Sequence, residues 1–118
     1  MTIQECYKQI GGNFEDVKKR FGGDMLVEKF AIKFLSDASF QELEDGLQEK
    51  DAEKAFRAAH TLKGICLNLG FDDLYEVSAA LTEKLRGREL NGYEADFAAV
   101  KECYEKTVNA IRAFQEKQ

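Results

Sequence analysis

Apolar side chains recur every three or four positions through most of the chain, which is the spacing of a helix with one buried face. The clearest stripe runs between residues 51 and 70 and consists of Ala52, Ala55, Phe56, Ala59, Leu62, Cys66 and Leu69. No segment shows the strict alternation that is typical of a strand. The 118 residues include no proline, which breaks helices and is frequent in loops. The pattern therefore predicts a chain that is helical almost throughout.

Capping residues divide the first part of the chain into separate helices. Thr2 and Glu5 have the spacing of a capping box, and Asn13 is placed to cap a second short helix. Asp24 is the expected cap of the next helix. Its apolar stripe continues as far as residue 47, and we expect a kink or brief break around 36–39.

Further helix signals define the second part of the chain. Asp51 is the expected cap of a helix that ends at Gly70, and Asp72 or Asp73 begins another. A turn at 91–92 precedes a long final helix marked by Phe97, Val100, Tyr104, Val108 and Ile111. Four substantial helices with short connections predict an all-α fold. We expect an antiparallel four-helix bundle, preceded by one or two short N-terminal helices and forming a single domain over 1–118.

The composition is that of an ordinary globular protein, with 44% hydrophobic and 33% charged residues. The formal net charge of −5 argues against general binding to nucleic acid or to anionic lipid. No apolar run approaches the roughly 20 residues that cross a bilayer. The first residues also lack the basic and apolar segments of a secretory signal, so we expect a cytoplasmic, membrane-free protein.

Cys6, Cys66 and Cys103 are odd in number and widely spaced, and no two of them form a C-x-x-C pair. A zinc site normally needs four ligands, and the chain has one histidine to add. The sequence therefore predicts free thiols, and neither a metal site nor a cofactor.

The single histidine, His60, lies on the helix expected over 51–69. At about 100° per residue it falls roughly 140° from the middle of the apolar stripe and faces solvent. Gly64 follows one turn later, in mid-helix, where glycine costs about 1 kcal/mol relative to alanine. A bare backbone beside the ring would let another protein approach closely. Leu67 lies near the same face and could belong to a small docking patch.

Positive charge surrounds this histidine. No Asp or Glu occurs between Lys54 and Phe71, whereas Lys54, Arg57 and Lys63 are all present. Such a collar is expected to attract an anion, either a phosphoryl group or an acidic partner surface.

Sequence signals of an enzyme are absent. The chain contains no G-x-S-x-G, no G-x-G-x-x-G and no G-x-x-x-x-G-K-[ST]. A helix bundle with short turns also offers little cleft for the carboxylate, nucleophile and oxyanion site of a hydrolase. We interpret His60 as a nucleophile that a partner's machinery acts upon, and the chain as a non-enzyme.

The run Ala59-His60-Thr61-Leu62-Lys63-Gly64, followed by Asn68-Leu69-Gly70, resembles the histidine-containing phosphotransfer (HPt) domain. The resemblance implies a phosphocarrier that exchanges a phosphoryl group between His60 and an aspartate of a response-regulator receiver domain. It also implies that Lys63 steadies the phosphoryl oxygens and that Gly64 gives the receiver access to the ring.

The resemblance further implies the carrier's partners. They are receiver domains, with a hybrid histidine kinase as a further candidate, and the receiver supplies Mg²⁺. With the patch derived above, the expected partner surface consists of Arg57, Gly64, Leu67 and Asn68. Nothing in the chain demands more than a monomer.

Two other interpretations stay open at this point. The same patch could serve a docking module in which no phosphate moves. The chain could also be the phosphoacceptor domain of a chemotaxis-type kinase, phosphorylated by a kinase domain in another chain.

Overall fold

The computed structural model describes residues 1–117, and within them every regular element is helical. The elements are α1 (Ile3–Ile10), α2 (Phe14–Phe21), α3 (Asp24–Lys33), a short 3₁₀ helix η1 (Phe34–Ser36), α4 (Ser39–Gln48), α5 (Ala52–Leu69), α6 (Asp72–Leu85) and α7 (Glu94–Glu116). The predicted all-α fold is confirmed. The expectation of a single domain over 1–118 stays a prediction, and residue 118 lies outside the described part of the chain.

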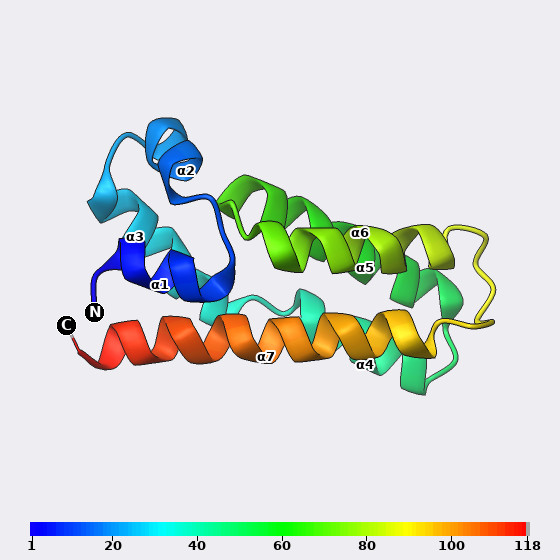
Figure 1. Cartoon of the computed structure of the whole chain (residues 1–118). Helices are drawn as coiled ribbons and strands as arrows, with labels where there is room; N and C mark the ends of the chain where they lie inside the picture. Colours follow the sequence, from blue (N-terminus) through cyan, green and yellow to red (C-terminus); the bar gives the residue numbers. More distant parts are fainter. Residues whose placement is uncertain (118) are drawn as a thin grey trace.

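Helices α4 to α7 form the bundle, and Figure 1 shows α7 running along the whole length of the molecule. Consecutive helices of the bundle pack against each other. Stacked aromatic rings join α4 to α7, because Phe40 lies 4.1 Å from Tyr104 and 5.9 Å from Phe97 between ring centroids. The C-terminal part of α7 extends beyond the bundle, and α1 packs beside it.

The expected interruption near 36–39 is a complete break. After η1 the chain is extended at Asp37, whose carboxylate accepts a hydrogen bond of 2.9 Å from the backbone N–H of Ser39. As a result α3 packs against α1 and α2, apart from α4 (Figure 1). Three helices therefore precede the bundle.

The N-terminal caps follow the sequence signals with one exception. Thr2 and Glu5 form both hydrogen bonds of the capping box, and Asn13 caps α2. Asp24 was expected to cap α3, and this is wrong. Gly23 takes the cap position without a side-chain hydrogen bond, and Asp24 is the first helical residue. Gly23 has φ 148°, in the region that glycine adopts readily.

Helix α5, which carries the histidine, has both ends fixed as predicted. The Asp51 carboxylate accepts a hydrogen bond of 3.1 Å from the N–H of Lys54 at the N-terminus. At the C-terminus Gly70 has φ 69°, and its N–H bonds back to the last turn. The predicted apolar stripe is confirmed except at Ala52, which is half-buried, and Ala58 is buried as well. The buried residues are Ala55, Phe56, Ala58, Ala59, Leu62, Cys66 and Leu69.

The N-terminal helices fasten the end of α5. The hydroxyl of the fully buried Tyr7 donates a 2.7 Å hydrogen bond to the carbonyl of Leu69, and the N–H of Asn13 donates one of 2.8 Å to the carbonyl of Gly70. A Cβ on Gly70 would lie 2.1 Å from a methyl of Val17, so no larger residue fits this junction without movement. The closing residues of α5 are therefore held from outside the bundle.

Replacing Tyr7 with Phe tests this fastening. The variant leaves the buried carbonyl of Leu69 without its donor, so we expect the free energy of unfolding to fall by about 1–2 kcal/mol. Urea unfolding followed by circular dichroism measures this. Tyr104→Phe is the matched control, because Tyr104 stacks on Phe40 and its hydroxyl makes no hydrogen bond within residues 1–117. Equal losses in both variants would contradict the assignment.

Candidate functional site

His60 lies on the outer face of α5 and is exposed, as predicted. Its ring centroid is 6.0 Å from that of Phe56, one turn earlier on the helix. Within residues 1–117 the imidazole makes no hydrogen bond or ion pair. The exposed ring, when neutral, therefore offers a lone pair to an incoming electrophile.

Two different surfaces flank the ring. At about 100° per residue, Gly64 and Asn68 lie on one side of His60 and Phe56 and Lys63 on the other. The Lys63 side faces α6, because Lys63 contributes, after the hydrogen bond from Arg86, to lowering the pKa of Glu83. On the Gly64 side, Asn68 lines a depression between α5 and the α3–η1 segment.

Gly64 has open space beside it. A Cβ built at this position would have no neighbour within 4 Å, whereas a Cβ on Gly46 of α4 would lie 2.8 Å from the backbone nitrogen of Ala55. Gly46 is therefore needed where α4 and α5 cross closely. Gly64 is not needed for packing within this chain, which supports the prediction that it keeps the approach to His60 clear.

The expectation that Lys54, Arg57 and Lys63 together form an uncompensated positive collar is wrong. The amine of Lys54 lies 3.2 Å from Glu49, and Nε of Arg57 lies 3.0 Å from Glu53, so both charges are paired. The collar argument counted only the segment after Lys54, and these two carboxylates precede it. Lys63, half-exposed, has no ion-pair partner among the described residues.

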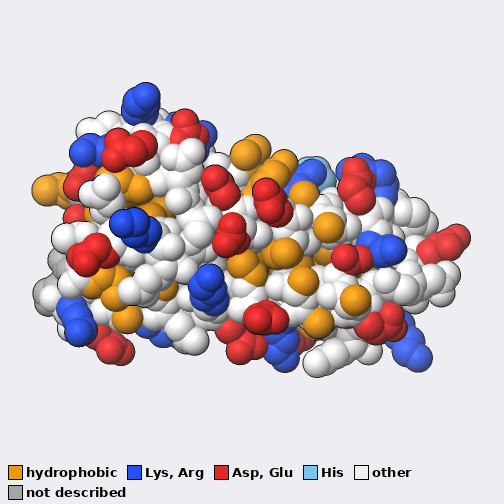
Figure 2. Space-filling model, in the orientation of Figure 1, with side chains coloured by type: hydrophobic (Ala, Val, Ile, Leu, Met, Phe, Trp, Pro, Cys, Tyr) orange, Lys and Arg blue, Asp and Glu red, His pale blue; other side chains and the backbone are white. Residues whose placement is uncertain are grey.

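Two arginines at the end of α6 and in the turn after it add positive charge beside the ring. Arg86 and Arg88 line a bay of about 400 Å³ together with His60, and both guanidiniums lie over the ring of Phe56. Sequence reasoning treated residues 86–92 only as a turn. The antiparallel course of α5 and α6 was the available signal, because it returns the end of α6 to the level of residues 53–60. Figure 2 shows the histidine at the edge of the molecule, among basic and acidic side chains.

Glutamates balance part of this basic charge. Glu53 accepts hydrogen bonds from Nε of Arg88 at 2.7 Å and from Nε of Arg57 at 3.0 Å, and these bonds lower the pKa of its carboxyl. Glu83 pairs with Arg86, whose hydrogen bond lowers the pKa of Glu83 in the same way. Both carboxylates stay ionised at neutral pH and orient the guanidiniums beside His60.

The partner residues predicted from sequence lie around the ring as follows. Arg57 lines the bay with His60, and Leu67 is 57% exposed on the outer face of α5. Asn68 lies farther along and lines a second depression. The structure therefore places Arg57 in the same bay as the ring, whereas Gly64, Leu67 and Asn68 follow His60 toward the C-terminal end of α5.

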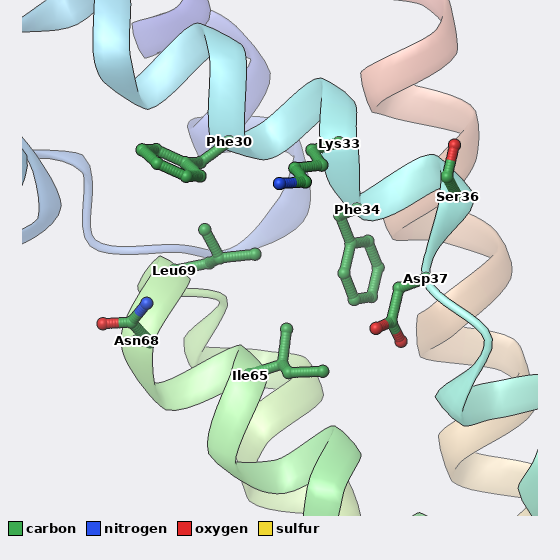
Figure 3. Close-up of a pocket in the computed structure, with 8 residues that line it drawn as sticks. All are labelled: Phe30, Lys33, Phe34, Ser36, Asp37, Ile65, Asn68 and Leu69. Atoms are coloured by element: carbon green, nitrogen blue, oxygen red, sulfur yellow. The ribbon is translucent and has the colours of Figure 1, made fainter.

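That second depression is a groove of about 340 Å³ that sequence reasoning missed. Figure 3 shows side chains of α3 and η1 on one side and of α5 on the other. Its lining residues are Phe30, Lys33, Phe34, Ser36, Asp37, Ile65, Asn68 and Leu69. The groove depends on where the break after η1 places α3, and no local sequence signal gives that direction.

The cysteines lie away from this surface. Cys6 and Cys66 are buried and Cys103 is half-buried, and all three are free thiols, as predicted. Burial raises the pKa of Cys6 to about 11 and raises that of Cys66 further. No group of three or more His, Cys, Asp or Glu side chains within the described residues is placed to hold a metal ion.

Comparison with protein families matches the Hpt domain to residues 34–110. The matched range covers more than half of the chain, from η1 into α7, and includes His60, Lys63 and Gly64. The chain belongs to the Hpt domain family. This confirms the resemblance seen in the sequence.

Hpt domains act in phosphotransfer of two-component signalling, as phosphocarriers rather than catalysts, and interact with receiver domains and kinases. Comparison with curated proteins and with solved structures gave no match. Among the described helices of this Hpt domain, none is long and apolar enough to cross a membrane.

The open space at Gly64 gives a stability prediction. Gly64→Ala should raise the free energy of unfolding by up to about 1 kcal/mol, because alanine is the better helix former and meets no neighbour. Gly46→Ala is the matched control and should lower it by about 1–3 kcal/mol through overpacking against Ala55. Urea unfolding compares the two, and a loss of stability in Gly64→Ala would contradict the open-space reading.

Proposed function

We propose that this Hpt domain is a phosphorelay carrier in which His60 accepts a phosphoryl group from a receiver-domain aspartate and passes it to a second receiver. The observation that carries the proposal is the exposed imidazole of His60 beside the open backbone of Gly64. A receiver aspartate can reach the ring only if no side chain of α5 stands in its way. The protein acts as a monomer in the cytoplasm.

The reaction is an in-line displacement at phosphorus. The lone pair of a His60 ring nitrogen forms the new P–N bond, the P–O bond of the aspartyl phosphate breaks, and the aspartate leaves as a carboxylate. The proton on the second ring nitrogen passes to solvent, and the return transfer reverses these steps. Catalysis is by positioning and charge neutralisation. Mg²⁺ enters with the receiver, and the carrier needs neither ATP nor a cofactor of its own.

The residues around the ring have two different roles, charge neutralisation and docking of the receiver. Lys63 neutralises charge on the phosphoryl oxygens, and its lack of an ion-pair partner within residues 1–117 leaves the amine free to do so. Gly64 and Leu67 form the surface on which the receiver docks, with Arg57 and Asn68 at its edges. The groove that Asn68 lines extends this surface with apolar side chains, which supports docking of a partner's apolar segment.

The first experiment mixes the protein with a phosphorylated receiver domain and Mg²⁺ and measures intact mass. We expect the wild type to gain the mass of one phosphoryl group, lost again in acid, and His60→Gln to gain none. Circular dichroism checks that the variant stays folded, which is expected because the ring makes no hydrogen bond within the described chain. Uptake by His60→Gln would refute His60 as the acceptor.

Two further measurements separate the two other interpretations. Receiver binding that is indifferent to phosphorylation of His60, with no gain of mass in wild type, would favour a docking module. Labelling by an ATP-using kinase domain, with none from phosphorylated receivers, would favour the chemotaxis-type phosphoacceptor.

Lys63→Ala tests charge neutralisation. The variant should slow transfer from a phosphorylated receiver without preventing it, by roughly fivefold or less, because a partly exposed cation contributes at most about 1 kcal/mol. Rapid-quench kinetics measure the rate. Lys84→Ala, at an exposed position near the end of α6, is the control and should leave it unchanged. An unchanged rate in Lys63→Ala would remove Lys63 from the mechanism.

A further inference from the structure

The bay beside His60 is built around one arginine. The guanidinium carbon of Arg88 lies 3.8 Å from the centroid of the Phe56 ring, a close cation–π contact. Its Nε donates to Glu53 at 2.7 Å, and its Nη1 donates to the carbonyl of Arg86 at 2.7 Å. A guanidinium carries five N–H donors, so these bonds leave three without a partner within residues 1–117. The group is held in place and still able to bind an anion.

The chain turns at Arg88, whose N–H donates a 2.9 Å hydrogen bond to the carbonyl of Leu85. Its φ is 58°, in the left-handed region that L residues other than glycine, asparagine and aspartate rarely adopt. Gly87, next to it, has no such angle. Lys50, just after α4, has the same φ of 58°, and in both places the left-handed residue follows the end of a helix. At Arg88 this turn places the side chain against Phe56 and Glu53.

The charges that face the bay do not cancel. Arg57, Arg86 and Arg88 line the bay with His60, and Lys63 follows His60 by three residues on α5. Glu53 and Glu83 are the two carboxylates paired with these arginines. Four cations and two carboxylates leave two positive charges. A phosphoryl group on histidine carries two negative charges above its second ionisation, so the bay matches it.

We propose that Arg88 binds the phosphoryl group carried by His60 and lengthens the lifetime of the phosphohistidine. This inference rests on the proposed function of His60 as phosphoacceptor. The Phe56 ring carries the Arg88 guanidinium and lies 6.0 Å from the ring of His60, and Arg88 and His60 line the same bay. On phosphorylation the free N–H donors of Arg88 turn to the phosphoryl oxygens, while Glu53 retains its second partner, Arg57.

The lifetime follows from charge. A phosphoryl group leaves an imidazole fastest when the other ring nitrogen is protonated, because neutral imidazole is a better leaving group than its anion. A guanidinium fixed beside the ring disfavours that additional positive charge. Arg88 therefore slows loss of the phosphoryl group to water, and Arg88 is a positioning and charge-stabilising residue rather than an acid or base.

The test phosphorylates the full chain with phosphoramidate, so that no receiver is needed. A ring nitrogen of His60 attacks phosphorus, the P–N bond of the reagent breaks, ammonia leaves, and the ring proton passes to buffer. We compare wild type with Arg88→Gly, which keeps the left-handed turn without strain. The decay of the phosphorylated mass at neutral pH should be about two- to fivefold faster in Arg88→Gly, the range for an exposed ion pair.

Phosphorus NMR separates contact from a merely structural role. The phosphohistidine resonance should shift in Arg88→Gly and return toward the wild-type position in Arg88→Lys, which restores the charge. Arg112→Gln, an exposed arginine on α7, is the control and should change neither the resonance nor the decay. The same lifetime and the same resonance in Arg88→Gly as in wild type would overturn the proposal.

Failure of the relay function has a different signature. A chain that takes up the phosphoryl group from phosphoramidate but exchanges none with receivers contradicts the proposed function, while the effect of Arg88 on lifetime is still measured. Failure of wild type to take up any phosphoryl group at His60 would overturn both proposals.

Discussion

Burial of the apolar face of α5 between α4 and α6 is the constraint on which the site depends. Ala59, Leu62 and Cys66 are fully buried, and Gly46 lets α4 approach the backbone of α5. Rotating α5 by one residue, about 100°, would expose Leu62 or bury His60. Either change costs on the order of the 1.5–3 kcal/mol that burial of one apolar side chain contributes. The outward direction of His60 is thus a consequence of core packing, without any hydrogen bond to the ring.

Packing around α5 sets its rotation, and contacts at its two ends set its position along the axis. Asp51 caps the N-terminus of α5. At the other end, the carbonyl of Leu69 accepts a hydrogen bond from the Tyr7 hydroxyl, and the carbonyl of Gly70 accepts one from the backbone N–H of Asn13. The helices before the matched Hpt range therefore do more than cover apolar surface. They hold the end of the helix that carries the acceptor, and α3 forms one wall of the groove beside it.

The sequence predicted what local rules determine and missed what depends on the path of the chain. The limits of α5 follow from Asp51 and Gly70, and the exposure of His60 follows from helical periodicity. The net charge around His60 could not be counted from residues 54–71 alone. The carboxylates that pair with Lys54 and Arg57 are Glu49 and Glu53, which precede that segment. Arg88 lines the bay beside His60 because the turn after α6, where Arg88 itself is left-handed, brings it back toward α5. The groove exists because the chain breaks after η1 and redirects α3.

The two flanks of His60 answer opposite requirements of a carrier. A phosphoryl group must survive between two encounters, and it must also leave readily once a receiver arrives. On the α6 flank each guanidinium already has a carboxylate partner in Glu53 or Glu83, so a phosphoryl group bound by the remaining N–H donors shares the positive charge with that carboxylate. The net gain from such a shared charge at an exposed site is small. On the Gly64 flank a Cβ at position 64 would meet none of the described residues within 4 Å, so the backbone beside the ring is open to an approaching receiver.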